Sequence, residues 1–90
     1  MDEAQALAAF EHFLVSKEAE FAQALGRVPI APERLSHGWA FYYQSRDFLE
    51  TGAFRDQLVG QGPVLVLDDG RVVAGGSLDW PPEVFLKRVW

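Results

Sequence analysis

Two histidines and a serine beside one of them are the side chains in this sequence best suited to chemistry. His12 and His37 are possible acids, bases or metal ligands, but no His-x-x-x-His spacing joins them and the chain has no cysteine, so metal ligation lacks support. Ser36 directly precedes His37. Neighbours in a strand point to opposite faces, so adjacency does not make these two a nucleophile and its base. The sequence therefore predicts no catalytic residue and no metal site.

Acidic and glycine-rich turns are the next candidates for chemistry. Asp68 and Asp69 precede Gly70, and turns favour aspartate because its carboxylate accepts hydrogen bonds from the local backbone. Gly60 and Gly62 could suggest a phosphate loop, but they lead into a predicted strand and lack the Gly-Lys-Ser/Thr or Gly-x-Gly-x-x-Gly pattern. Turn formation explains both segments, and we expect no cofactor.

Composition and charge restrict the class of protein. The chain has 90 residues, of which 49% are hydrophobic and 23% charged, which predicts one small domain over residues 1–90 with a single core. Its net charge of -5 argues against a nucleic-acid partner and would steer a basic protein partner toward this surface. The lack of cysteine fits the cytoplasm. We expect no membrane span, because the run Val64–Leu67 is far shorter than the about 20 residues required, and no signal peptide, because the chain starts with Asp2 and Glu3 instead of basic residues.

The first part of the chain predicts an amphipathic helix followed by an extended arm. Large apolar residues recur with helical spacing at Leu7, Phe10, Phe13, Leu14, Phe21 and Leu25. Asp2 and Gln5 have capping-box spacing, and Gly26 is expected to end the helix. Residues 28–32 contain two prolines, so we expect an extended edge strand or arm there.

Residues 38–45 predict the strongest strand, because aromatic side chains favour a pleated surface. Alternation places Trp39, Phe41 and Tyr43 on the face covered by the first helix. It places Ala40, Tyr42 and Gln44 on a second, more polar face.

The rest of the chain predicts two short helical segments, a hairpin and a final helix. A short helix over residues 46–52 follows Ser45 as its N-cap, and a second short segment covers residues 53–59. Strands over 63–67 and 71–74 flank the Asp-Asp-Gly turn, and Asp79 with Pro-Pro-Glu at 81–83 marks the start of the last helix before Val84. The predicted fold class is α+β, in the order α-β-β-(short α)-β-β-α. We expect a four-stranded antiparallel sheet, packed on one face by the N-terminal and C-terminal helices.

Four ordered motifs resemble those of a known family. They are Gly-Trp-Ala-Phe-Tyr-Tyr-Gln-Ser at 38–45, Phe-Leu-Glu-Thr-Gly at 48–52, Leu-Val-Gly-Gln-Gly-Pro-Val-Leu-Val at 58–66, and Gly-Ser at 76–77 with Pro-Pro-Glu at 81–83. This pattern resembles immunity protein 35, also called the YrhB domain, between about Gly38 and Leu86. Gln61 stands where that family more often has asparagine, and the spacer in the last motif differs slightly.

The resemblance implies an immunity protein of a bacterial polymorphic toxin system, used in competition between bacteria. Such a protein binds its cognate toxin stoichiometrically and blocks the active or substrate site, so it is not an enzyme and needs no cofactor. One alternative is a small chaperone-like, stress-associated protein of the YrhB type. A small hydrolase that depends on His37 is a third hypothesis.

The family motifs are expected to serve the fold, and the partner surface to lie elsewhere. Glu50 is expected to accept backbone hydrogen bonds at the start of the next segment, with a contact to the partner as the alternative. Exposed positions on the second sheet face, the hairpin tip and the loop before the last helix are the predicted partner-binding residues: Tyr42, Gln44, Asp68, Asp69, Asp79 and Trp80.

Overall fold

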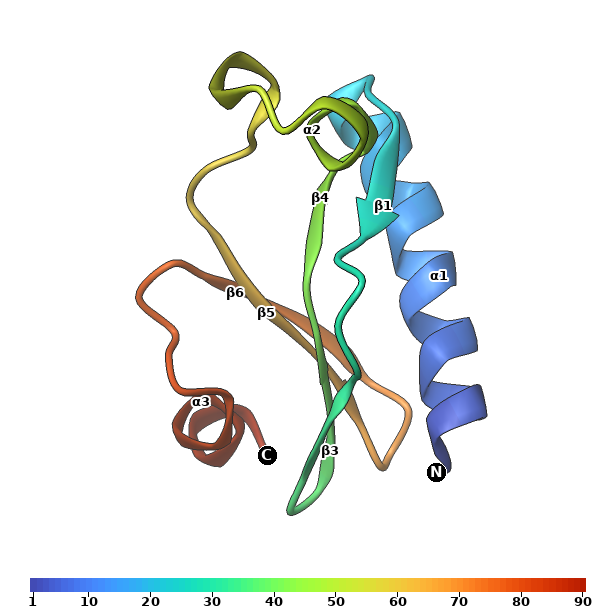
Figure 1. Cartoon of the computed structure of the whole chain (residues 1–90). Helices are drawn as coiled ribbons and strands as arrows, with labels where there is room; N and C mark the ends of the chain where they lie inside the picture. Colours follow the sequence, from blue (N-terminus) through green and yellow to red (C-terminus); the bar gives the residue numbers. More distant parts are fainter.

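The computed structural model describes residues 1–90 as three α-helices, a short 3₁₀ turn and six strands (Figure 1). The helices are α1 (Glu3–Phe21), α2 (Arg46–Thr51) and α3 (Pro82–Val89), and the 3₁₀ turn η1 covers Phe54–Asp56. The strands are β1 (Leu25–Arg27), β2 (Glu33–Leu35), β3 (Gly38–Phe41), β4 (Tyr43–Ser45), β5 (Gln61–Leu67) and β6 (Val72–Gly76). The predicted α+β class and the order of elements are confirmed.

The strands form two antiparallel sheets. The predicted four-stranded sheet has the order β2-β3-β5-β6, and an additional two-stranded sheet pairs β1 with β4. In the hairpin between β5 and β6, Val66 pairs with Val72, and Gly70 has a φ of 94° that favours glycine. The predicted hairpin is therefore confirmed, with strands that begin or end one or two residues away from the predicted positions.

Helices cover both faces of the large sheet, so the prediction of a single core on one face is wrong. Figure 1 shows α1 on one side of the sheet and α3 on the other. One buried cluster lies under α1 and consists of Ala6, Phe10, Leu14, Leu25, Phe41, Tyr43, Val64 and Val66. The other lies under α3 and consists of Leu35, Ala40, Leu65, Leu67, Phe85 and Leu86. Alternate residues of β5 point to opposite faces, so this strand contributes to both clusters.

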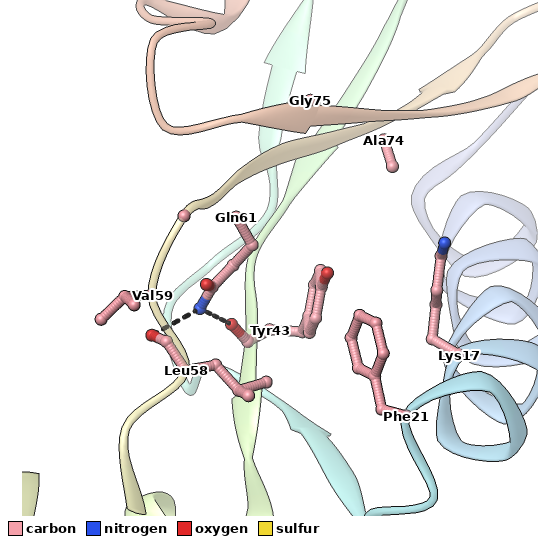
Figure 2. A pocket seen from close by; sticks show the side chains of 9 residues that line it. Lys17, Phe21, Tyr43, Leu58, Val59, Gln61, Ala74 and Gly75 are labelled. Carbon is pink, nitrogen blue, oxygen red and sulfur yellow. Dashed lines mark hydrogen bonds between the residues drawn. The ribbon is translucent and has the colours of Figure 1, made fainter. Parts of the chain in front are cut away.

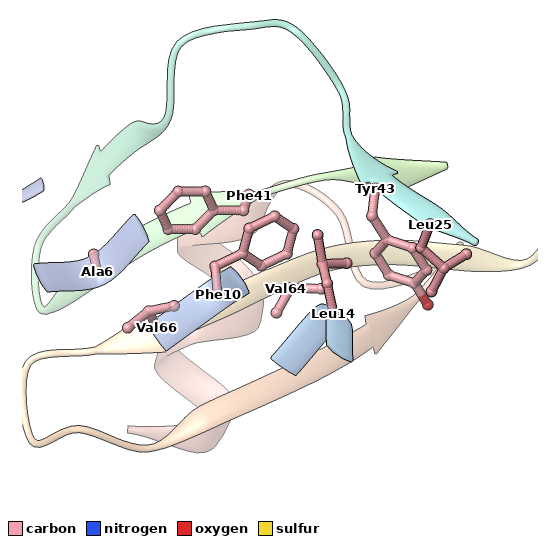
Figure 3. Packing of buried hydrophobic residues seen from close by; sticks show 8 residues of the cluster. All are labelled: Ala6, Phe10, Leu14, Leu25, Phe41, Tyr43, Val64 and Val66. Carbon is pink, nitrogen blue, oxygen red and sulfur yellow. The ribbon is translucent and has the colours of Figure 1, made fainter. Parts of the chain in front are cut away.

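Phe10 is the central side chain of the cluster under α1 (Figure 3). It is fully buried, and its ring stacks on that of Phe41 with centroids 4.7 Å apart. Burial of such a side chain stabilises the fold by about 1.5–3 kcal/mol. This contact holds α1 against β3. The prediction that the first helix covers the aromatic face of residues 38–45 is therefore confirmed at Phe41.

The first helix begins as predicted but ends earlier. Asp2 accepts from the backbone N–H of Gln5 at 2.8 Å and donates its own N–H to the Gln5 side chain at 3.0 Å, which confirms the capping box. The helix stops at Phe21, followed by Ala22 with a φ of 52°. The expected stop at Gly26 is wrong, because that residue lies in β1. A Cβ at Gly26 would lie 2.8 Å from Leu49 Cδ1, so glycine permits close packing of α2 on β1.

The predicted strand over residues 38–45 is interrupted at Tyr42, which separates β3 from β4. Opposite this break lie residues 28–32, which we call the arm. The arm connects β1 to β2 and is not itself a strand, so the edge-strand alternative is wrong for these residues. The prolines deprive the arm of two backbone donors, and Val28 donates its N–H to the carbonyl of Tyr42 at 2.9 Å.

The segment from α2 to β5 combines confirmed and incorrect predictions. Ser45 is the N-cap of α2 and accepts from the Phe48 N–H at 3.0 Å, as predicted. Of residues 53–59 only η1 is helical. Glu50 is exposed and makes no hydrogen bond; instead Thr51 Oγ1 accepts from the Ala53 N–H at 3.2 Å. The short threonine side chain reaches the next backbone donor, so the expected role of Glu50 is wrong.

Candidate partner-binding surface

An open pocket forms where the arm, the break at Tyr42 and the loop before α3 meet. β3 pairs with β5 from Gly38 to Phe41, but β4 pairs only with β1, so the sheet opens at this end. We call the resulting hollow of about 400 Å³ the arm pocket. It is lined by Val28, Ile30, Tyr42, Tyr43, Gln44, Gln61, Gly62 and Trp80.

The rim of the arm pocket exposes large apolar side chains to solvent. Ile30 is 55% exposed and Trp80 is 62% exposed. The Trp80 ring is tilted against that of Tyr42, with centroids 6.0 Å apart and an interplanar angle of 48°. Concave apolar surfaces with exposed aromatic side chains are typical of ligand and protein contact sites.

Tyr42 carries a buried polar atom without a partner. Its hydroxyl oxygen is the one buried side-chain nitrogen or oxygen in the chain that makes no hydrogen bond. Burial, with a smaller contribution from the charge of Glu33, raises the pKa of Tyr42 to about 12. The hydroxyl is therefore neutral at physiological pH and is able to donate or accept a hydrogen bond.

Gln44 is not on an exposed face, and this premise of the sequence prediction is wrong. Its side chain is 8% exposed. Its Nε2 donates to the carbonyl of Leu58 at 2.9 Å, and its Oε1 accepts from the N–H of Leu58 at 2.9 Å and of Ser45 at 3.0 Å. β4 does not pair as a strand with the segment before β5. The bonds between Gln44 and Leu58 hold these two parts of the chain together instead. Gln44 therefore shapes the floor of the arm pocket from within.

Asp68 and Asp69 lie at the hairpin away from the arm pocket, and both have internal partners. Arg34 donates to the two oxygens of Asp68 at 3.0 and 3.2 Å, and this bond lowers the pKa of Asp68. Asp69 accepts from the backbone N–H and Nε of Arg71 at 3.0 and 2.8 Å; the backbone bond, then the side-chain bond, lower its pKa. The turn role predicted for Asp69 is confirmed.

Asp79 stabilises the loop that carries Trp80. Its Oδ2 accepts from the N–H of Gly76 at 2.7 Å, and its Oδ1 accepts from the Arg88 guanidinium. The bond from Gly76 and then that from Arg88 lower the pKa of Asp79. Asp79 thus ties the end of β6 to α3 and helps to position Trp80 beside Tyr42.

These carboxylates predict a loss of stability in acid. Asp68, Asp69 and Asp79 have folded-state pKa values below their ordinary 3.8, so the unfolded chain binds more protons as the pH falls through this range. We expect the urea midpoint to hold from about pH 7 to about pH 5 and then to fall toward about pH 2.5. Asp68→Asn should make this fall shallower than in the wild-type protein. An unfolding midpoint that rises on acidification would contradict the assignment.

The histidine and serine candidates lie apart from the arm pocket. Ser36 donates its hydroxyl to Glu83 Oε1 and its N–H to Glu83 Oε2, the latter at 3.1 Å, and these two bonds lower the pKa of Glu83. The His37 ring stacks on Trp90 with centroids 4.6 Å apart and planes 3° apart. His12 is exposed on α1. No three His, Asp or Glu side chains are grouped to hold a metal ion.

A second pocket of about 390 Å³ lies on the α1 side of the same opening (Figure 2). Its lining includes Lys17 and Phe21 of α1, and Tyr43 and Gln61 line both pockets. Gln61 Nε2 donates to the carbonyls of Tyr43 at 3.4 Å and Leu58 at 3.2 Å. This side chain therefore fills part of the opening between β4 and β5, at the position where asparagine was expected from the family resemblance.

Three of the six predicted partner-binding residues come together in the arm pocket: Tyr42, Gln44 and Trp80. The three aspartates line neither pocket. Sequence reasoning did not select Val28 and Ile30, although an isoleucine between two prolines in a predicted arm is a signal of an exposed apolar side chain.

The chain is a small α+β domain with an open pocket whose rim exposes apolar side chains. Residues 4–82 match the family of immunity protein 35. The chain belongs to this family, and the resemblance seen in its motifs is confirmed. No curated protein and no solved structure matches the chain significantly. No helix is both long and apolar enough to cross a bilayer.

Proposed function

We propose that this chain binds a cognate bacterial toxin and neutralises it by stoichiometric occlusion of the toxin's active or substrate site. The observation that carries this proposal is the match to immunity protein 35 over residues 4–82. In this proposal the protein acts in the cytoplasm of the producing cell, in a polymorphic toxin system used against competing bacteria. It works by contact alone and catalyses no reaction.

The domain is large enough to carry a standard interface, and we propose that this interface surrounds the arm pocket. A standard interface buries about 800 Å² on each partner, which is roughly a seventh of the 5323 Å² exposed by this chain. We propose that Tyr42 and Trp80 contact the toxin directly. Gln44 would support them from the pocket floor, and Asp79 would position the Trp80 loop. Asp68 and Asp69 would lie at the margin of the contact.

The distribution of charge supports a basic partner. Six of the eight lysine and arginine side chains form ion pairs with carboxylates of the same chain. Five exposed carboxylates have neither an ion pair nor a hydrogen bond: Glu3, Glu11, Glu33, Asp47 and Glu50. The surplus negative charge is therefore free to attract a basic toxin, and association should slow as salt is added.

The proposal is tested by co-expressing this chain with the product of a toxin gene adjacent to its own gene. We expect the toxin alone to stop growth, and equal expression of this chain to restore it. The two purified proteins should form a stable complex by size-exclusion chromatography. Growth arrest that persists with soluble chain present would contradict the function. Suppression of aggregation of several unrelated proteins, without protection from the toxin, would favour the chaperone-like alternative.

A further inference from the structure

We infer that the arm pocket receives a basic side chain of the toxin, a lysine or an arginine. Its aliphatic stem would lie against Ile30 and Trp80, and its cationic head would hydrogen-bond the hydroxyl of Tyr42. This inference rests on the proposed function and specifies the chemistry of the partner at one site.

The unpartnered hydroxyl of Tyr42 is the first observation. Buried polar atoms in folded proteins are almost always hydrogen-bonded, because a bond to water has been given up. This hydroxyl is the exception in the chain, and it belongs to a residue that lines an open apolar pocket. A ligand that brings a hydrogen-bond donor to this oxygen restores the missing bond and gains affinity from it.

The pocket walls favour a donor with a long apolar stem. Ile30 and Trp80 provide an exposed apolar rim, and the methylene groups of lysine and arginine pack well on such surfaces. The rings of Tyr42 and Trp80 are tilted toward each other, 6.0 Å apart. A cation near their faces is attracted by the negative potential above each ring.

The charges around Tyr42 also favour a cation. Glu33 is exposed and unpaired, and its charge acts on the Tyr42 hydroxyl. Arg27 opposes the cation, but its Nη1 donates to the carbonyl of Ile30 at 3.3 Å, so its head group is held by the arm. With a net charge of -5 on the chain, a basic group gains more here than an acidic or neutral one.

The hydroxyl is covered in the free protein, so the occupant must move part of the rim. Ile30 and Trp80 are the exposed rim side chains, and rearrangement of interface side chains on binding is common. Ile30 or Trp80 would change rotamer to admit the basic head to Tyr42, and both side chains would remain in contact with the stem.

Tyr42→Phe is the decisive variant, because it removes only the hydroxyl. We expect toxin affinity, measured by calorimetry with the purified toxin, to fall about tenfold or more. We expect Tm to stay unchanged or to rise by about 2–5 °C, since an unsatisfied buried group is removed. Loss of binding without loss of stability distinguishes a partner contact from a structural role. Ser16→Ala is the control, because it removes an exposed hydroxyl on α1 that does not line the arm pocket, and its affinity should equal that of the wild type.

Two charge variants test the sign of the occupant. Glu33→Gln should weaken the complex about two- to fivefold, and Arg27→Gln should strengthen it by a similar factor. Tighter toxin binding by Glu33→Gln together with weaker binding by Arg27→Gln would show that the occupant is not a cation. Unchanged affinity of both variants would show the same. Unchanged or tighter binding of Tyr42→Phe would show that nothing bonds the hydroxyl, and would overturn the inference. If wild-type protein fails to bind the toxin at all, the proposed function itself fails, a result that these variants cannot produce.

Discussion

Replacement of Gly62 by alanine is expected to destabilise the fold by about 3 kcal/mol or more, a large share of the stability of a small domain. A Cβ at this position would lie 1.9 Å from the carbonyl oxygen of Gly76 and 2.6 Å from its carbonyl carbon. Both are backbone atoms of the neighbouring strand, so no side-chain rotation relieves the clash. β5 and β6 would have to separate where their register is already irregular. Urea unfolding followed by circular dichroism measures the loss.

Gly60→Ala provides the matched control for this prediction. Gly60 has a φ of 92° but nothing within 4 Å of an added Cβ, so we expect a cost of only about 1–2 kcal/mol from the left-handed backbone. If both variants lose the same free energy of unfolding, the result would contradict the close approach of β5 to β6 at Gly62.

Trp80→Ala is expected to weaken toxin binding by about 30-fold or more, because tryptophans at the centre of contacts are often dominant in affinity. The side chain is 62% exposed in the free protein, so its removal should change Tm little. Calorimetry with the purified toxin gives the affinity, and a thermal melt gives the stability. A variant that unfolds would assign Trp80 to the fold.

Leu78→Ala is the control for Trp80. Leu78 lies on the same loop and is 93% exposed, but it does not line the arm pocket. Its replacement should alter affinity less than about threefold, because exposed contacts outside the centre contribute little. Equal effects of both variants would indicate that the loop as a whole, not the pocket, makes the contact.

Local sequence signals predicted the parts of the fold that depend on neighbouring residues. The Asp2 capping box, the Ser45 cap and the hairpin at Gly70 are each built from interactions within a few residues, and each is confirmed. Gly26 was predicted to end the first helix, but it leaves room for the side chain of Leu49, which belongs to α2. Leu25 fitted the helical stripe by spacing but is buried in a strand.

Some predictions that required knowledge of distant partners failed. The aromatic run at 38–45 is uniform in propensity, but the structure divides it at Tyr42, because pairing with β5 ends at Phe41 and pairing with β1 begins at Tyr43. The consecutive apolar residues Val64–Leu67 carried a signal of a strand covered on both sides, which explains the second helix-covered face.

The candidate site was predictable in part. Tyr42 and Trp80 were selected as exposed aromatic positions, and the structure brings them together. Asp68 and Asp79 were predicted as exposed positions at the hairpin tip and before the last helix, but they form ion pairs with Arg34 and Arg88 of the same chain. Spacing does not reveal such pairs, because each partner comes from another element of the fold.

Titration of the purified toxin with this protein tests the central claim most directly. If neutralisation results from one-to-one occlusion, residual toxin activity should fall in a straight line and vanish at one molar equivalent, when both are well above the Kd. Inactivation by a small fraction of an equivalent would mean that the protein modifies the toxin catalytically. Full activity in the presence of excess protein would mean that occlusion does not occur.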